Sequence, residues 1–246
     1  MSRASAQGTV EPFEHDVRRR GGYHYTSERL SCRLANERIS DAVLAGASFA
    51  GRRVIDVGCG DGTYTCELAA LARPALIHGI DPAGAAIAVA RERVEGDAAI
   101  TFDVASAYEL PHEAGEFDVG VVRGVLHHVD EPRRVIAEAL RVAPTVVVVE
   151  PNGLNPGLKL LERVSAYHVD HEERSYPPIR LDRWVREQGG RTICRQWVGF
   201  VPMFAPDVYA RAAKRIEPLL EALPGARSVL CAQYVFTARR QPTTIV

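Results

Sequence analysis

The chain has 246 residues, 46% of them hydrophobic, which is enough apolar material for the core of one large domain. Its 30 lysine and arginine residues and 31 acidic residues leave a formal charge of -1, so the composition excludes a general attraction to nucleic acid or to an anionic membrane. The five cysteines include no C-x-x-C pair, which is typical of a reducing cytoplasm and predicts neither a disulfide framework nor a zinc-cysteine site. No apolar run is long enough to span a bilayer, so we expect a cytoplasmic protein whose partners are small molecules.

The N-terminal part of the chain is predicted to contain a tail and one helix. Residues 1–20 show no periodicity and are expected to form a flexible tail, which precedes a single domain over residues 21–246. From Thr26 onward, apolar residues recur at helical spacing and predict an amphipathic helix that ends near Gly46.

Strand and helix patterns alternate over residues 50–150, which we expect to form the core of the domain. Strands are predicted at 53–57, 75–80, 99–104, 117–122 and 145–150, and helices at 62–72, 83–95 and 132–142. Pro82 and Pro132 each stand where a helix should begin, and Pro144 stands where one should end. The alternation predicts an α/β fold whose parallel sheet is covered by helices on both faces.

Beyond Glu150 the pattern becomes less regular. Residues 151–180 and about 200–227 are expected to be two cap insertions, the second with a helix from Pro206 to about Leu223. Between them, a helix is predicted near 181–188 and a strand near 192–199, and a last strand is predicted near 229–238.

The most informative motif is the turn after the first strand, where glycine alternates with other residues from Gly58 onward. Alternating glycines let the backbone approach a ligand, and the helix that follows presents free N–H groups to an anion. We therefore expect this turn to bind a nucleotide-like cofactor through Asp56, Gly58, Cys59 and Gly60. The alternative is a tight turn that needs glycine only for its own geometry. Thr63 stands where a dinucleotide-binding G-x-G-x-x-G needs its third glycine, which disfavours NAD.

A second candidate contact is the pair Asp81 and Pro82, about twenty residues after the glycines. An acid at the end of the second strand can accept hydrogen bonds from both hydroxyls of a ribose. An aspartate directly before a proline is also a good helix cap, so both roles are open at this position. In combination with the glycine turn, we favour the ribose.

Residues 50–150 resemble, in order and spacing, the motifs of the class I S-adenosylmethionine-dependent methyltransferases, above all the type-11 small-molecule branch. The resemblance is carried by Val54 to Thr65, Gly79 to Pro82, Glu109 to Pro111, Glu116 to Val119 and Val125 to Val129. It implies a Rossmann-like fold with a seven-stranded, mostly parallel sheet whose last strand is antiparallel. It also implies S-adenosyl-L-methionine as cofactor, bound between the first and fourth strands, and methyl transfer to a small organic acceptor.

The resemblance implies further contacts, residue by residue. Arg123, after the fourth strand, corresponds to a position that touches the methionine end of the cofactor through its backbone. Ser106 replaces the aspartate that usually bonds the adenine amino group, and Ala107 could still offer a backbone N–H to the ring. The segment from Tyr23 to Tyr25 stands where related enzymes often fold a lid, and Arg29 could meet the cofactor carboxylate.

His127 and His128 lie at the strand-to-helix crossing beside the expected methyl group and are the candidate general bases. A neutral imidazole can take a proton from a hydroxyl or an amine during transfer. Paired histidines suit hydroxyl deprotonation, so we favour O-methylation over C- or N-methylation. Glu150 could orient one of the histidines, and each histidine could instead simply pack or line the pocket.

The sequence leaves two alternatives to methyl transfer. Ser106 favours a non-catalytic protein that binds S-adenosylmethionine or a partner, and a nicotinamide-dependent oxidoreductase ranks last because of Thr63. A metal site is not predicted, because the cluster His168, His171, Glu172 and Glu173 offers no further ligand at a diagnostic spacing. The sequence indicates no particular oligomeric state.

Overall fold

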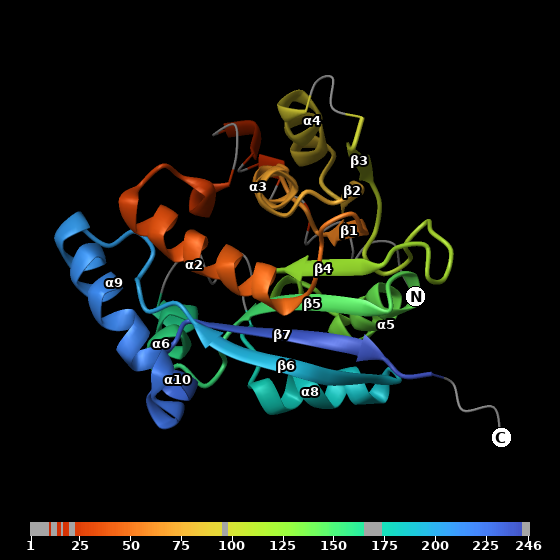
Figure 1. Cartoon of the computed structure of the whole chain (residues 1–246). Coiled ribbons are helices and arrows are strands. Elements are labelled where there is room, and N and C mark those ends of the chain that lie inside the picture. The colour runs from red at the N-terminus through yellow and green to blue at the C-terminus, as the bar shows by residue number, and fades with distance from the viewer. Residues whose placement is uncertain are drawn as a thin grey trace.

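The computed structural model describes residues 10, 14–15, 17–19, 23–94, 98–164 and 174–242. Its centre is a seven-stranded sheet with the order β3-β2-β1-β4-β5-β7-β6 (Figure 1). Neighbouring strands from β3 through β5 are parallel, and β7 runs antiparallel to both β5 and β6. The predicted α/β sheet with an antiparallel last strand is therefore confirmed. The strands are β1 Arg53–Val57, β2 Leu76–Asp81, β3 Ile100–Val104, β4 Val119–Arg123, β5 Thr145–Pro151, β6 Gly190–Val198 and β7 Gln233–Arg240.

The central strands are apolar throughout because both of their faces are buried. In β5, Val146 and Val148 belong to one core cluster, while Val147 and Val149 belong to the cluster on the opposite face. Successive side chains of a strand point to opposite faces, so an unbroken valine run fits a strand that is covered on both sides.

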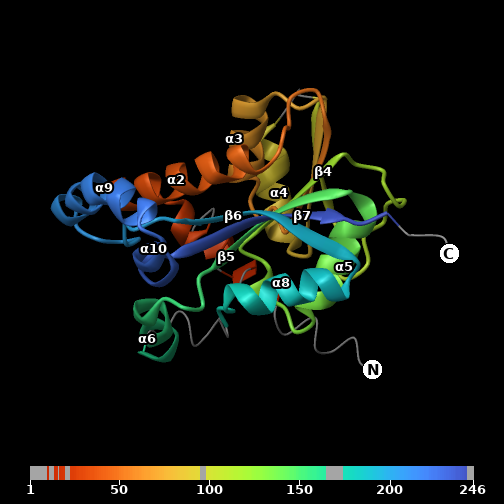
Figure 2. The same ribbon diagram turned by 60° about the horizontal axis from the view of Figure 1, so that its bottom comes forward.

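Each face of the sheet has its own helices, as Figures 1 and 2 show. α2 (Leu30–Gly46) and α3 (Thr63–Ala72) contribute to the cluster on one face, and α5 (Pro132–Val142) and α8 (Pro178–Glu187) contribute to the other. α4 (Gly84–Arg93) packs on the β3 edge through Ile87 and Ala90, which contact Phe102. This arrangement leaves the carboxyl ends of the parallel strands at one edge, where open α/β sheets bind ligands.

The helix predicted from Pro206 to about Leu223 is present, and the expected cap insertions contain two further helices that were not predicted. α6 (Pro156–Val164), α9 (Asp207–Ala222) and α10 (Pro224–Leu230) gather at one end of the molecule (Figures 1 and 2). Asn155 caps α6 by accepting hydrogen bonds from the backbone N–H groups of Gly157 and Leu158, and its side-chain amide donates to the Leu230 carbonyl. The last strand was predicted to begin near 229, but α10 extends to Leu230 and β7 begins at Gln233.

In the segment that was expected to be a flexible tail, Val17 and Val10 pack against an apolar cluster. Val17 is buried against Tyr23, Ala83 and Ala86, so it covers the start of α4. Within residues 23–94, 98–164 and 174–242, no helix has both the length and the apolar content needed to cross a membrane.

Candidate functional site

The glycine turn after β1 adopts a conformation that other residues rarely reach. Gly58 and Gly60 have φ angles of 76° and 56°, and the N–H groups of Gly58 and Cys59 both donate to the Ile80 carbonyl of β2. A Cβ atom at Gly60 would lie 2.6 Å from the Tyr23 ring, and one at Gly58 would lie 2.4 Å from the Val125 side chain. The turn therefore needs glycine both for its backbone and for its close neighbours.

A cavity of about 780 Å³ opens beside this turn, at the carboxyl edge of the sheet. Its walls come from α2, α3, the ends of β1, β4 and β5, α6, and the segment that follows β6. Most of the predicted site residues line it: Asp56, Gly58, Cys59, Gly60, Arg123, His127 and His128. Asp81, Pro82, Ser106 and Ala107 are not part of its wall. A cavity of this size is in the range that holds small-molecule ligands.

Asp56 is a buried carboxylate at the floor of this cavity. Its side chain is only 5% exposed and accepts a hydrogen bond of 2.6 Å from the Thr65 hydroxyl of α3. Burial raises the pKa of Asp56 to about 6, against the opposing influence of the Thr65 hydrogen bond and the Arg123 charge. At neutral pH the group is therefore mostly ionised and places a negative charge beside the glycine turn.

Arg123 ends β4 and faces α2 and α3. Its Nη1 and Nη2 atoms donate to Ser40 Oγ at 3.0 Å and to Asn36 Oδ1 at 3.1 Å, and its guanidinium carbon lies 3.6 Å from the centre of the Tyr64 ring. Burial lowers the pKa of Arg123 from its usual value, although an arginine remains charged at neutral pH. The cavity thus contains a fixed positive charge as well as the negative charge of Asp56.

His127 lies in the short helix η2 (Leu126–His128) and pairs with the buried Glu150 of β5. The His127 Nδ1 atom is 2.8 Å from Glu150 Oε2, which is the contact the sequence suggested for this glutamate. Glu150 Oε1 also accepts the backbone N–H groups of Val125 and Leu126, at 3.0 and 2.8 Å. Since an ionised carboxylate only accepts, the proton sits on Nδ1 and leaves Nε2 as the basic nitrogen. The ring of His128 lies beside that of His127, with centroids 3.8 Å apart.

Asp81 accepts hydrogen bonds from two turns of the backbone, and its contact with the ribose stays a prediction. One carboxylate oxygen accepts the Ala83 N–H at the start of α4, at 2.8 Å, and the other accepts the Gly60 N–H, at 3.0 Å. Burial raises the pKa of Asp81 to about 6. A carboxylate has about four acceptor sites, so about two remain for ribose hydroxyls. Tyr23 and Val17 belong to one apolar cluster with Ala83, and the Tyr23 ring lies against Gly60.

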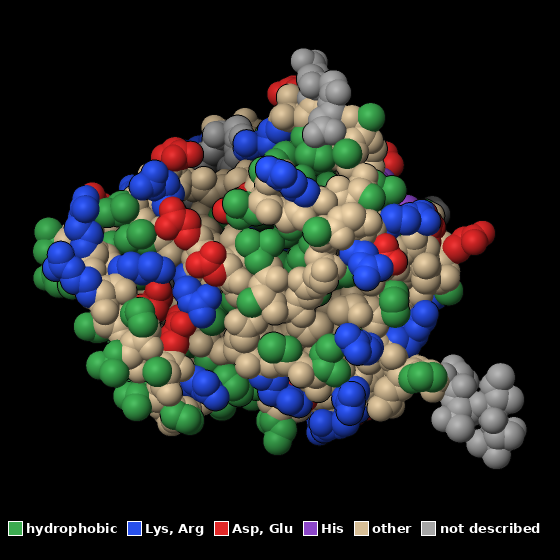
Figure 3. Space-filling view, viewed as in Figure 1, with side chains coloured by type: hydrophobic (Ala, Val, Ile, Leu, Met, Phe, Trp, Pro, Cys, Tyr) green, Lys and Arg blue, Asp and Glu red, His purple; other side chains and the backbone are tan. Residues whose placement is uncertain are grey.

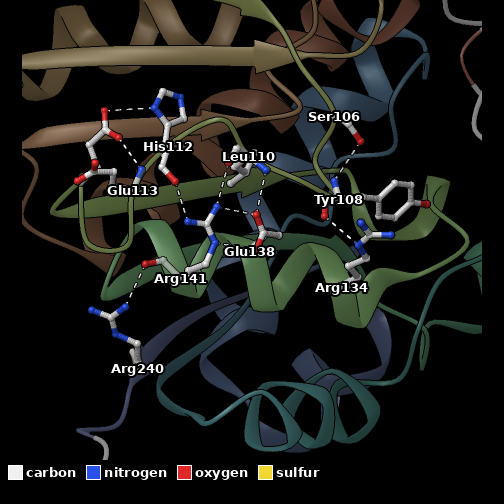
Figure 4. A network of polar contacts seen from close by, with 10 residues as sticks. Ser106, Tyr108, Leu110, His112, Glu113, Arg134, Glu138, Arg141 and Arg240 are labelled. Carbon is white, nitrogen blue, oxygen red and sulfur yellow. Dashed lines mark hydrogen bonds and ion pairs between the residues drawn. The ribbon is translucent and has the colours of Figure 1, made fainter.

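The segment that carries Ser106 and Ala107 follows β3 and is attached to α5 by a polar network (Figure 4). Arg141 donates to the carbonyls of Leu110 and His112, at 2.9 and 2.7 Å, and Glu138 accepts the Leu110 N–H at 2.9 Å. Ser106 Oγ accepts the Tyr108 N–H, so it stabilises this turn. The backbone N–H of Ala105 donates to the Asp81 carbonyl, which places the segment next to the β2 end.

The remaining predicted features have mixed outcomes. Tyr23 and Tyr25 stack with ring centroids 5.5 Å apart and line the cavity, while Arg29 is exposed at the start of α2. The cluster His168, His171, Glu172 and Glu173 lies outside the described residues.

Sequence reasoning missed a set of polar residues on α2 and α3 that face the cavity. Ser40 donates to Glu67 at 2.8 Å while accepting from Arg123, and Asn36 donates to the Tyr25 carbonyl at 3.0 Å. The missed residues that line the cavity are Asn36, Ser40, Tyr64 and Glu67, and Thr65 is a further missed residue, which donates to Asp56. One signal was available, because Asn36 and Ser40 are polar residues on the otherwise apolar face of the amphipathic α2 pattern.

These residues fit the cofactor that the sequence resemblance implies. The glycines leave a backbone cradle, which an added Cβ would fill, and the helix after it begins with Thr63, whose N–H already bonds Asp61. Asp56 and Arg123 place opposite charges in one cavity, which suits the zwitterionic amino-acid part of S-adenosylmethionine. When bound, the cofactor supplies an activated methyl group on a sulfonium.

Comparisons with known proteins identify the family of the chain. A family model described as a methyltransferase domain matches residues 55–145. The chain is 33% identical over 173 residues to a ubiquinone biosynthesis O-methyltransferase of Methylococcus capsulatus, covering 65% of this chain and 72% of that protein.

Two solved structures share the fold over nearly the whole chain. A geranyl diphosphate C-methyltransferase from Streptomyces coelicolor has a TM-score of 0.68 and 13% identity, and the match covers 96% of this chain and 97% of that one. A possible histamine N-methyltransferase from Thermotoga maritima has a TM-score of 0.67 and 17% identity, and the match covers 95% and 100%.

The named acceptor atoms of these three proteins differ, so the fold by itself does not decide the acceptor. The matches favour neither a nicotinamide-dependent oxidoreductase nor a non-catalytic binding protein. From the family match and the O-methyltransferase relative, the chain belongs to the class I S-adenosylmethionine-dependent methyltransferases and is an enzyme that uses S-adenosyl-L-methionine as its methyl donor.

Proposed function

We propose that this enzyme transfers the methyl group to a hydroxyl oxygen of a small, largely apolar acceptor, with His127 as the general base. The observation that carries the proposal is the His127–Glu150 pair at the wall of the cavity. The O-methyltransferase name of the Methylococcus relative supports the same acceptor atom.

The pair suits proton removal from a hydroxyl. Glu150 fixes the His127 ring through Nδ1, and its own position is fixed by two backbone N–H groups. Nε2 then takes the proton of the acceptor hydroxyl, and the carboxylate stabilises the imidazolium that forms. The cavity aligns the acceptor oxygen with the methyl group and limits access of water, which is most of what this reaction asks of a protein.

The far half of the cavity supports an apolar acceptor. Three leucines of α6 and four apolar residues of the segment after β6 form its wall. They are Leu158, Leu160, Leu161, Phe200, Val201, Met203 and Phe204. Leu160 and Leu161 are 61% and 45% exposed, so the rim of the cavity is apolar as well as its interior. Exposed apolar side chains that surround a cavity are typical of a ligand-binding surface.

Other expectations from the sequence remain proposals. We propose a single catalytic domain with α6, α9 and α10 as the cap over the acceptor, and the cytoplasm as its location. On the face shown in Figure 3, basic and acidic side chains are interspersed, which supports a small-molecule partner rather than nucleic acid.

The proposal is tested by His127→Asn, because the asparagine amide can keep the bond to Glu150 while removing Nε2. With labelled S-adenosylmethionine and a panel of apolar hydroxyl compounds, we expect the variant to lose about 100-fold or more in kcat. Its affinity for S-adenosylhomocysteine should stay within about twofold of wild type in calorimetry. An unchanged kcat, or label that appears only on amine or carbon acceptors, would contradict the proposal.

A further inference from the structure

The side chain of Arg123 is a cation whose hydrogen bonds, among the described residues, go to neutral groups. Its two hydrogen bonds go to the neutral oxygens of Ser40 and Asn36, and its face lies on the Tyr64 ring. Within the described part of the chain, no ion pair joins Arg123 to an aspartate or glutamate. A guanidinium away from bulk water is costly unless a partner compensates its charge, so an anion bound in the cavity would be stabilised by Arg123.

The guanidinium still has donors to offer to such an anion. Arginine carries five N–H donors in a planar fork, and the two contacts to α2 use one on each terminal nitrogen. The Tyr64 ring and the two α2 side chains hold the fork in place, which reduces the entropy lost when it binds a ligand. A planar fork with free donors matches the geometry of a carboxylate.

The nearest acids of the cavity point to the kind of molecule that brings this carboxylate. Glu67 already accepts a hydrogen bond from the Ser40 hydroxyl at 2.8 Å, whereas among the described residues Thr65 is the hydrogen-bond donor to the Asp56 side chain. Asp56 and Arg123 stand on the adjacent strands β1 and β4, on the face covered by α2 and α3. A negative and a positive group side by side are complementary to an α-amino acid zwitterion.

We propose that the Arg123 side chain binds the α-carboxylate of the methionine portion of S-adenosylmethionine. This assigns a role to the side chain and not only to the backbone of this residue. The competing arginine, Arg29, is exposed at the start of α2 and does not line the cavity.

The same contacts connect the carboxylate site to the segment over the glycine turn. Asn36 accepts from Arg123 and donates to the Tyr25 carbonyl at 3.0 Å, and Tyr64 reaches the same carbonyl at 3.5 Å. Tyr25 stacks on Tyr23, whose ring lies against Gly60. An anion bound at Arg123 therefore also fixes the residues that hold this segment.

The test compares two ligands that differ in the amino-acid portion. S-adenosylhomocysteine carries the α-carboxylate, whereas 5′-methylthioadenosine carries the adenosine and the thioether without it. In calorimetry, we expect Arg123→Gln to lower the affinity for S-adenosylhomocysteine by at least about tenfold. The affinity for 5′-methylthioadenosine should stay within about twofold of wild type. The affinity of Arg123→Lys for S-adenosylhomocysteine should lie between those of the wild type and Arg123→Gln, because lysine keeps the charge but lacks the planar fork of donors.

The controls separate a carboxylate contact from a general loss of charge or of structure. Arg33→Gln removes an exposed charge from α2 and should change neither affinity. The proposal is overturned if Arg123→Gln leaves the affinity for S-adenosylhomocysteine unchanged, or if it lowers the affinity for both ligands by the same factor. It is also overturned if Arg29→Gln, and not Arg123→Gln, lowers the affinity for S-adenosylhomocysteine while sparing that for 5′-methylthioadenosine. Because the readout is cofactor binding, these outcomes do not depend on the identity of the acceptor.

Discussion

The two ends of the cavity are built in different ways. At the glycine turn, the wall consists of backbone groups and buried polar side chains such as Asp56, each with defined hydrogen-bond partners. At the opposite end, α6 and the segment after β6 present apolar side chains, several of them exposed. Directional contacts define a single ligand, whereas apolar surface accepts any molecule of suitable size. In the proposed function, the end with directional contacts therefore holds the cofactor, and the apolar end holds the acceptor.

The largest loss of cofactor affinity is expected when a side chain fills the glycine turn. Gly60→Arg places a side chain where a Cβ atom alone would lie 2.6 Å from Tyr23, at a φ of 56°. We expect cofactor affinity to fall by more than about 1,000-fold, which corresponds to about 4 kcal/mol. Calorimetry with S-adenosylhomocysteine measures this loss.

The matched control for this change lies at the acceptor end. Gly225, in α10, has nothing within 4 Å of its added Cβ, so Gly225→Arg should retain both the fold and the cofactor affinity. Equal loss of affinity in both variants would mean that the turn has no special role.

A smaller effect is expected at the ribose position. Asp81→Ala removes the acceptor for the Gly60 and Ala83 N–H groups and for the proposed ribose hydroxyls. The affinity for S-adenosylhomocysteine should fall by about 1–3 kcal/mol, and that for adenosine should fall in parallel. If adenosine affinity stays at the wild-type level, the side chain serves only as the cap of α4.

The buried charge of Asp56 should be visible as a pH dependence of stability. Because burial raises the pKa of Asp56 from 3.8 to about 6, the native state binds more protons than the unfolded state between these values. The free energy of unfolding therefore falls as the pH rises through this window, by about 1–3 kcal/mol from this group. Asp56→Asn keeps an acceptor for Thr65 and removes the charge, so it should be more stable than wild type at pH 7 and weaker in cofactor binding.

Urea denaturation at pH 4.5 and pH 7.5 checks this prediction. The stability difference between Asp56→Asn and wild type should grow in favour of the variant at the higher pH. A difference that is the same at both pH values would show that Asp56 is not the group responsible.

The smallest expected effect is at the apolar end. Phe204 lines the cavity with a φ of 65°, a left-handed conformation that costs a bulky residue about 1 kcal/mol or more. Phe204→Ala and Phe204→Gly should both raise the KM of an apolar acceptor by about three- to tenfold and leave cofactor affinity unchanged. The glycine variant should be the more stable of the two in thermal denaturation. If the KM does not change, Phe204 does not contact the acceptor.

The fold could be predicted largely because its signals are local. The valine run of β5 and the alternating glycines after β1 fix strand and turn within a few residues, and Pro132 marks the helix start. The end of α9 near Leu223 was predicted, but the short α10 that begins at Pro224 was not, because its seven residues carry no clear helical pattern. α6 carried a signal in Asn155 and Pro156, but the surrounding residues resemble a loop.

The site could be predicted only where strand ends determine it. His127 follows β4 and Glu150 lies near the end of its parallel neighbour β5, so their meeting can be inferred from topology. The contacts of Arg123 with α2 join residues 83 and 87 positions apart in the sequence. Such contacts depend on how α2 lies across the sheet, which helical periodicity does not determine. The position of Tyr23 over Gly60 is hidden from the sequence for the same reason.

The most direct test of this account is a calorimetric titration of the wild-type protein with S-adenosylhomocysteine, with NADH as the comparison ligand. The cavity beside the glycine turn predicts binding of S-adenosylhomocysteine with a Kd on the order of micromolar and no binding of NADH. Binding of NADH alone, or of neither ligand, would contradict the assignment of the glycine turn and its charged neighbours to the methyl donor.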